Sequence, residues 1–204
     1  MLQFRRWTDA GCFEAMVSEM RSINRVGVGH KGQPSAVILE GRTLQSSCES
    51  GPRAGYNSYK LRRGSKVHVV VDTLGQLVGL TVMQASEYER VGQKDLCKAV
   101  QQVTSETMKI AWTDQGYTGD KTRKAPKAAG IDHQIVKLSE AKKEFFLLPR
   151  RWVVERSFGR LSRFRRLSRD FERMPHVLSG LHFVVFCILI LPKVPFWMAL
   201  KANS

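Results

Sequence analysis

Acidic residues are scarce in this chain of 204 residues. Eighteen Asp and Glu stand against 33 Lys and Arg, so the formal net charge is +15 and the isoelectric point is near 10.1. A surplus of this size indicates a polyanionic partner. Nucleic acid ranks first, an anionic membrane surface second, and a soluble basic protein without such a partner last.

Paired cysteines are missing as well. The four cysteines are scattered, with no CxxC pair and no Cys/His cluster at zinc spacing; they are Cys12, Cys48, Cys97 and Cys187. This absence excludes a zinc-finger module and a disulfide framework. We therefore predict buried free thiols in a reducing cytoplasm.

The chain also lacks a long apolar run. The longest one, Leu181–Leu191, includes His182 and stops at Pro192. A membrane-spanning helix needs about 20 apolar residues, so this run predicts a buried C-terminal helix and no membrane partner. The first residues, Met1 to Arg6, lead into a polar stretch and do not open a signal peptide.

Short β-rich runs alternate with helical patterns along the rest of the chain. We predict strands at 35–43, 66–71, 77–83, 108–113 and 133–138, with a hairpin turn at 72–75 and a loop over 45–59. Helical spacing appears at 1–25, 92–103, 119–129 and 150–171. This order predicts an α/β fold with a mixed sheet flanked by helices.

Two acids stand out on chemical grounds. Asp114 follows a predicted buried strand, where α/β sheets place their ligands, and Glu155 lies in the helix predicted from residue 150. Taken singly, Asp114 also suits a turn or N-cap, and Glu155 an ion pair with Arg151 or Arg156. Together they suit two-metal phosphodiester chemistry, which needs several carboxylates converging on two cations.

Three segments carry a family resemblance. They are KVHVVVDTLG at 66–75, WTDQGYTG at 112–119 and LPRRWVVERSF at 148–158. They closely resemble the DDE transposases of bacterial insertion sequences, and the similarity extends from about Phe4 to Leu191. The resemblance implies a ribonuclease-H-like catalytic core. It also implies Mg²⁺-dependent strand cleavage and strand transfer at transposon ends.

Carried over by position, the resemblance makes Asp114 the second metal-binding acid and Glu155 the third. The first is expected to be Asp, but this chain has Glu40, whose extra methylene moves the carboxylate by more than about 1 Å. A shift of this order can cost about a hundredfold in rate, so Glu40 is expected to bind metal with impaired turnover. Asp72 is the alternative first acid, although its place in Asp-Thr-Leu-Gly favours a turn.

An arginine-rich face accompanies these acids. Nine arginines and three acids lie between Arg150 and Arg173. Family members tend to carry an arginine at the position of Arg151, and their later basic residue falls at Ser162, for which the neighbouring Arg163 is a substitute. We expect four side chains to bind DNA phosphates: Arg151, Arg156, Arg160 and Arg163.

The resemblance also implies the cofactor, the partners and the domains. Mg²⁺ is expected at Glu40, Asp114 and Glu155, with Mn²⁺ as a substitute. The expected partner is double-stranded DNA, both transposon ends and target, in the cytoplasm at the nucleoid, with a homodimer on DNA left open. Residues 1–30 are expected to be the remnant of an N-terminal DNA-recognition domain, 31–192 the catalytic core and 193–204 a tail. The alternatives are a catalytically inactive DNA-binding remnant and an unrelated basic nucleoid protein.

Overall fold

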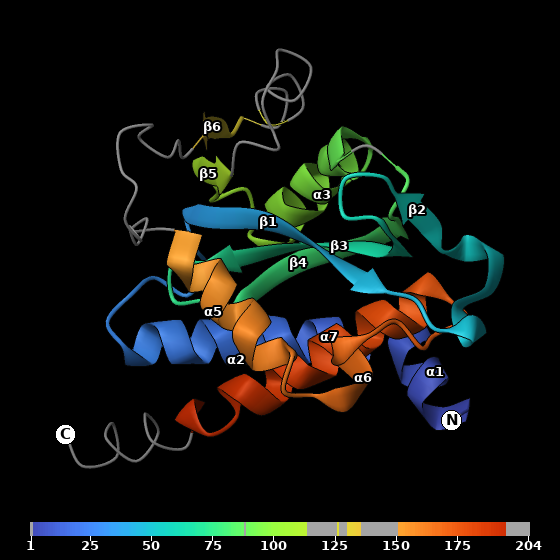
Figure 1. Cartoon of the computed structure of the whole chain (residues 1–204). Coiled ribbons are helices and arrows are strands. Elements are labelled where there is room, and N and C mark those ends of the chain that lie inside the picture. Colours follow the sequence, from blue (N-terminus) through green and yellow to red (C-terminus); the bar gives the residue numbers. More distant parts are fainter. Residues whose placement is uncertain (1, 88, 114–125, 127–129, 136–150, 195–204) are drawn as a thin grey trace.

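The structure is a computed structural model. It describes residues 2–87, 89–113, 126, 130–135 and 151–194. A central sheet separates two layers of helices (Figure 1): α3 (Glu89–Val103) covers one face, and the helices from the two ends of the chain cover the other. Those helices are α1 (Leu2–Asp9), α2 (Cys12–Gly27), α5 (Arg151–Leu161), α6 (Arg165–Ser168) and α7 (Pro175–Ile190).

The sheet combines antiparallel and parallel pairing. A hairpin of β3 (Arg62–Asp72) and β4 (Leu77–Gln84) lies on one side of β1 (Ala36–Gln45), and β3 runs antiparallel to β1. On the other side, β5 (Ile110–Thr113) and then β6 (Asp132–Ile135) run parallel to β1. The short β2 (Gly55–Asn57) pairs with the start of β3. The predicted α/β fold, a mixed sheet flanked by helices, is confirmed.

Each face of β1 belongs to a different hydrophobic core, because successive side chains of a strand point to opposite faces. Val37 and Leu39 join the core under α3. Ile38 and Leu44 join the larger core, which also contains side chains of α2, α5 and α7. Residue 40 is an even number of positions from Ile38 and Leu44, so it lies on the same face of the sheet, the one covered by α5.

All five predicted strands are present, the last of them as far as residue 135, where the described residues end, and the 72–75 turn is confirmed. Several other local predictions are wrong. The N-terminal helix is two helices, because Gly11 has a left-handed φ of 68° between them. The predicted loop at 45–59 contains the 3₁₀ helix Cys48–Arg53 and β2. Cys12 and Cys48 are exposed, so only Cys97 and Cys187 match the buried thiols expected.

The long helix predicted for 150–171 is also wrong, because α5 ends at Leu161. Phe164 is extended, with φ −89° and ψ 112°, before the single turn of α6. Leu161 and Leu167 are both buried in the same core, so the apolar spacing continues across a break in the helix. The predicted helix at 119–129 falls almost wholly outside the described residues.

The C-terminal apolar run forms a buried helix as predicted. α7 packs against α2 and contributes Leu178, Phe183 and Phe186 to the larger core. Within the described residues, no helix is both long enough and apolar enough to span a bilayer.

Candidate active site

Glu40 lies near the middle of β1, and its residue is only 8% exposed. Its backbone is opposite Val69 of β3, and the preceding residue, Leu39, pairs with Thr113 of β5. Strands on both sides therefore fix the backbone here. Glu40 is the residue that the family resemblance assigns to the first metal-binding position, and it is a buried carboxylate on the central strand.

The second predicted acid, Asp114, lies outside the described residues. It directly follows Thr113, the last residue of β5. Thr113 is buried, and its hydroxyl lies 2.7 Å from Nε2 of His133 in β6. The end of β5 next to Leu39 is therefore fixed on both sides up to the residue before Asp114.

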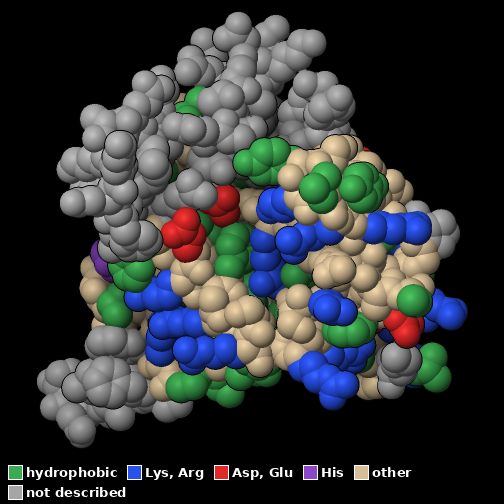
Figure 2. All heavy atoms as spheres, viewed as in Figure 1, with side chains coloured by type: hydrophobic (Ala, Val, Ile, Leu, Met, Phe, Trp, Pro, Cys, Tyr) green, Lys and Arg blue, Asp and Glu red, His purple; other side chains and the backbone are tan. Residues whose placement is uncertain are grey.

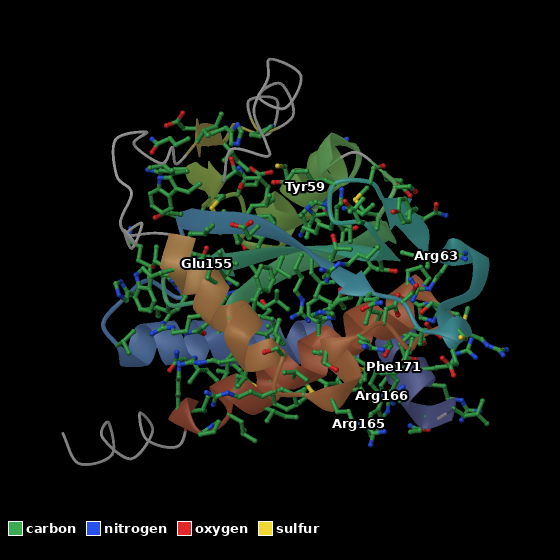
Figure 3. All side chains as sticks on the ribbon, in the orientation of Figure 1. Tyr59, Arg63, Glu155, Arg165, Arg166 and Phe171 are labelled. Carbon is green, nitrogen blue, oxygen red and sulfur yellow. The ribbon has the colours of Figure 1, made fainter. Side chains whose placement is uncertain are left out.

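Glu155 lies in the first half of α5, which contacts β1 and β3. Figure 3 shows it near the end of the helix that approaches β1. Val153, Val154 and Leu161 are buried on the core side of this helix, whereas Glu155 is exposed. The third predicted acid is therefore presented at the surface, next to the sheet face that carries Glu40.

The β3–β4 turn holds α5 in place. The Ser157 hydroxyl donates to the Gly75 carbonyl oxygen at 3.2 Å. Gly75 has a φ of 75°, and a Cβ there would lie 3.2 Å from Ser157 Oγ. Glycine is required for both reasons, since L side chains avoid this φ and the helix passes close by.

Asp72, the alternative first acid, has the turn role that the sequence favoured. Its Oδ1 accepts hydrogen bonds of 2.9 Å from the backbone N–H groups of Leu74 and Gln76. Its Oδ2 forms a buried ion pair of 2.7 Å with Arg25 of α2. Asp72 is thus committed to the turn and to Arg25.

Arg42 is a neighbour of the site that the sequence analysis missed. Arg42 lies two residues beyond Glu40 on the same face of β1. Its guanidinium donates to the Leu167 carbonyl oxygen at 2.9 Å and lies over the Phe158 ring of α5. Its other contact is Nε2 of the buried His182, 3.4 Å away. Burial lowers the pKa of Arg42 to about 10. The two-residue alternation of the strand was the signal that could have identified it.

The predicted DNA-binding arginines lie on and after α5. The Arg156 guanidinium stacks 4.2 Å from the centre of the Trp152 ring, and burial followed by repulsion from Arg160 lowers the pKa of Arg156. Arg156 and Arg163 are exposed and Arg160 is partly exposed. The backbone of Arg151 begins α5, but its side chain lies outside the described set. Figure 2 shows that Lys and Arg far outnumber acidic side chains on this face.

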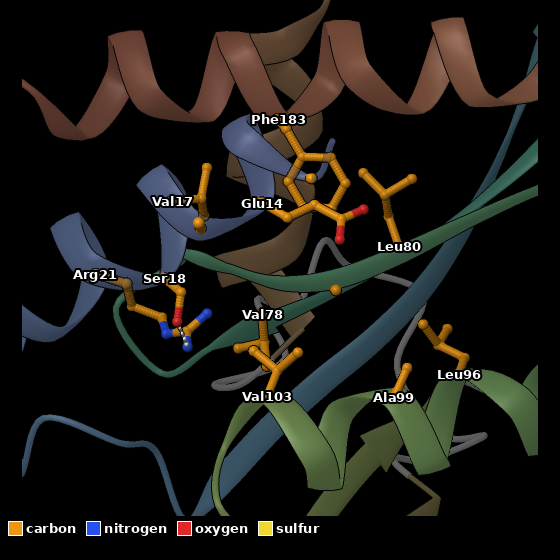
Figure 4. A pocket seen from close by; sticks show the side chains of 13 residues that line it. Glu14, Val17, Ser18, Arg21, Val78, Leu80, Leu96, Ala99, Val103 and Phe183 are labelled. Carbon is orange, nitrogen blue, oxygen red and sulfur yellow. Dashed lines mark hydrogen bonds between the residues drawn. The ribbon is translucent and has the colours of Figure 1, made fainter. Parts of the chain in front are cut away.

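Among the described residues, two sizeable cavities lie away from β1. One, of about 330 Å³, lies between α2, β4 and α3 and is shown in Figure 4. It is mainly apolar, although Glu14, Ser18 and Arg21 contribute to its wall. The other, of about 500 Å³, is lined by Arg156 and Lys193 together with the β3–β4 turn.

Over the residues that the structure describes, no three His, Cys, Asp or Glu side chains form a group that could hold a metal ion. Asp114 is not among those residues, so the predicted three-acid set stays a prediction.

Comparison with known families decides the class of protein. The family model of the Transposase DDE domain matches residues 31–191, more than three quarters of the chain. The chain belongs to the DDE transposase family. It is therefore a DNA transposase by class, as the sequence motifs predicted.

A bacterial relative agrees with this assignment. The transposase is 29% identical over 146 residues to a Burkholderia cepacia protein named as a putative transposase for insertion sequence element IS402, covering 68% of each chain. A chain of the simian T-cell lymphotropic virus intasome with PP2A regulatory subunit B56 gamma is 14% identical, with a TM-score of 0.47, covering 74% of this chain but about half (48%) of that one. The catalytic core domain of BIV integrase is 15% identical, with a TM-score of 0.39, covering 72% of this chain and 80% of that domain.

Proposed function

We propose that this transposase cuts DNA strands at transposon ends and joins them to target DNA, using Mg²⁺ or Mn²⁺ held by Glu40, Asp114 and Glu155. The observation that carries the proposal is the position of Glu40. It lies on the central strand, on the face covered by α5, one residue beyond the point where β1 and the end of β5 pair.

The register of β1 and β5 supports the inclusion of Asp114. Leu39 pairs with Thr113 in parallel strands, and Glu40 and Asp114 directly follow these two residues in the sequence. Because neighbouring strands lie about 4.8 Å apart and consecutive Cα atoms about 3.8 Å apart, we propose that these two acids lie close together. Trp112, two residues earlier, joins the core on the α5 face, and strand alternation predicts the same face for Asp114.

The donor set suits the metal. Carboxylate oxygens are ligands that Mg²⁺ and Mn²⁺ prefer, and Glu40, Asp114 and Glu155 would hold the ions. A pair of ions bound there supplies Lewis-acid activation of the attacking and leaving oxygens of a phosphodiester. The protein contributes positioning: the sheet fixes Glu40, the β3–β4 turn orients α5 with Glu155, and the arginines bind the phosphates on either side of the scissile bond.

The chemistry proceeds in two displacements at this site. Water attacks the phosphodiester at a transposon end and releases a 3′ hydroxyl. That hydroxyl then attacks a phosphodiester of the target DNA and displaces the target's 3′ oxygen, so that the transposon 3′ end is joined to the target 5′ phosphate and a new target 3′ hydroxyl is released. Both steps need the same acids, so removing one acid should abolish both.

Glutamate at position 40 is expected to slow this chemistry. Hydrogen bonding to β3 on one side, and the pairing of the adjacent Leu39 with β5 on the other, prevent the backbone from retreating to absorb the extra methylene. This favours a second candidate function, a DNA-binding transposase that turns over poorly or not at all.

Nicking of supercoiled plasmid in Mg²⁺ or Mn²⁺ tests the proposal. The wild-type chain should nick the plasmid, whereas Asp114→Asn and Glu155→Gln should abolish nicking. Glu19→Gln removes an exposed acid of α2 and is the matched control. Equal nicking by wild type and Asp114→Asn would overturn the proposed three-acid site.

The DNA partner also sets the proposed location. Transposon ends and target DNA of an insertion sequence lie in the bacterial nucleoid, so we place the protein in the cytoplasm with the chromosome. Assembly as a homodimer on DNA is part of the same proposal, and sedimentation with and without a transposon-end duplex would test it.

A further inference from the structure

The cavity of about 500 Å³ beside α5 has a basic rim built from segments far apart in the sequence. Its lining comes from the end of α2, the β3–β4 turn, α5 and the segment after α7, and consists of Asn24, Val28, Thr73, Leu74, Arg156, Pro192 and Lys193. The site therefore exists only in the folded chain.

Positive charge is concentrated at this cavity, and the attraction of Lys193 to Asp72 offsets it only in part. Arg160 and Arg156 both lower the pKa of Lys193, after the larger effect of burial, so the three cations lie close enough to repel one another. The nearby acid is Asp72, but its carboxylate is already paired with Arg25. Among the described residues, neither Arg156 nor Lys193 forms a salt bridge with an acid.

Arg156 is held ready for a ligand. Its guanidinium is stacked over the Trp152 ring, so its planar face is occupied while its N–H groups can donate at the edge. An oriented guanidinium and an ammonium at one cavity can share the oxygens of a single phosphate group. Arg156 is also the residue after Glu155, so this ligand would lie close to the proposed cleavage site.

From these observations we infer that the cavity binds one phosphodiester of the DNA strand that leaves the proposed active site, with Lys193 and Arg156 as its ligands. The inference rests on the proposed function for the identity of the anion. Lys193 gives the region after α7 a role in DNA binding. The family resemblance predicts only a tail for residues 193–204.

Equilibrium binding of a 30-base-pair duplex, measured by fluorescence anisotropy in EDTA at several salt concentrations, tests the inference. Lys193→Gln should weaken binding about five- to tenfold at 0.1 M salt and lower the slope of log K against log salt by about one, as expected for one lost phosphate contact. Lys98→Gln removes an exposed lysine of α3, on the opposite face of the sheet, and should have little effect.

Two further measurements separate a shared phosphate from general charge loss. Arg156→Gln and Lys193→Gln should be non-additive, whereas Arg165→Gln and Lys193→Gln should be additive. Acetylation followed by mass spectrometry should show that duplex protects Lys193 more than Lys98. Equal effects of Lys193→Gln and Lys98→Gln, or protection of Lys193 by inorganic phosphate but not by duplex, would overturn the inference.

Because EDTA removes the metal, failure of the two proposals can be told apart. Binding that depends on Lys193 in a protein that never nicks plasmid would sink the proposed cleavage activity and leave the cavity's role intact. If nicking requires Asp114 but DNA binding is unchanged by Lys193→Gln, the proposed cleavage activity stands and the cavity's role in DNA binding is refuted.

Discussion

Asp170 accepts two hydrogen bonds of 2.7 Å from one guanidinium nitrogen of Arg53, although the two residues are 117 positions apart. The Ser65 hydroxyl of β3 donates to the same carboxylate at 2.6 Å, and Asp170 is fully buried. This group of contacts joins the segment after α6 to the far end of the sheet. It therefore fixes the path that the chain takes between α5 and α7.

Asp170→Asn should be strongly destabilising, because it leaves Arg53 without its acidic partner in a buried site. Removing one member of a buried ion pair typically costs about 3–5 kcal/mol. Urea unfolding followed by circular dichroism would measure the loss. Asp9→Asn, at an exposed side chain, should change the free energy of unfolding by less than about 0.5 kcal/mol, and equal effects would refute the role of the pair.

Gly75→Ala should loosen α5 from the β3–β4 turn. The left-handed φ costs an L residue about 1–2 kcal/mol, and the new Cβ would also press on Ser157 Oγ at 3.2 Å. Gly29 has a similar φ of 81°, and a methyl group added there would meet nothing within 4 Å, so Gly29→Ala isolates the backbone cost. Gly75→Ala should lose more stability than Gly29→Ala and should also nick DNA more slowly. Equal losses of stability would show that the contact with α5 is unimportant.

Two buried histidines should make the fold acid-sensitive. Burial, assisted by Arg42, lowers the pKa of His182 to about 3, and burial with Lys66 lowers that of His68 to about 4, from an ordinary 6.5. The unfolded chain therefore binds more protons below pH 6.5, and stability falls as the pH drops from there towards 4 and 3.

At pH 5 each histidine should cost about 2 kcal/mol relative to neutral pH. His182→Gln should flatten the pH dependence of the free energy of unfolding by that amount, while His30→Gln, at an exposed position, should leave it unchanged. If the two variants have the same pH profile, His182 is not held neutral by the fold.

Glu40→Asp should raise the rate of nicking, because it withdraws the carboxylate by one methylene to the length expected at this position. A displacement of about 1 Å can be worth about a hundredfold, which sets the upper scale of the gain. Single-turnover nicking of plasmid in Mn²⁺ would measure it, with the melting temperature as the check on folding. Absence of nicking from both wild type and Glu40→Asp would favour the inactive DNA-binding alternative.

Much of the sheet could be predicted because strand alternation and the hairpin turn are local signals. Asp72 was correctly favoured as a turn residue from four consecutive residues. The family motifs supplied Glu40 and Glu155. The structure adds that Glu40 lies on the face of the sheet against which α5, the helix of Glu155, packs.

Apart from the helix break at Gly11, which is local, the main failures depend on contacts between distant segments. The apolar spacing through Leu161 and Leu167 is compatible with one long helix or with two helices that pack on the same core. Tertiary contacts favour two helices, because Arg42 donates to the Leu167 carbonyl oxygen and the Asp170 N–H donates to the Gln45 carbonyl oxygen. Strand alternation places Arg42 on the face of Glu40, but neither its contact with Leu167 nor the pairing of Arg53 with Asp170 could be found from spacing, since each partner lies more than a hundred residues away. Lys193 could not be predicted either, because the cavity that it lines is formed with Arg156 and the β3–β4 turn, which are distant in the sequence.

The most direct test of the shared metal site is cleavage of the protein backbone by Fe²⁺ and ascorbate in place of Mg²⁺. Hydroxyl radicals cut the chain next to the bound ion, so the account predicts cuts near residues 40, 114 and 155 together, all suppressed by excess Mg²⁺ and all lost in Asp114→Asn. Cuts near only one of these residues, or cuts that persist in Asp114→Asn, would contradict it.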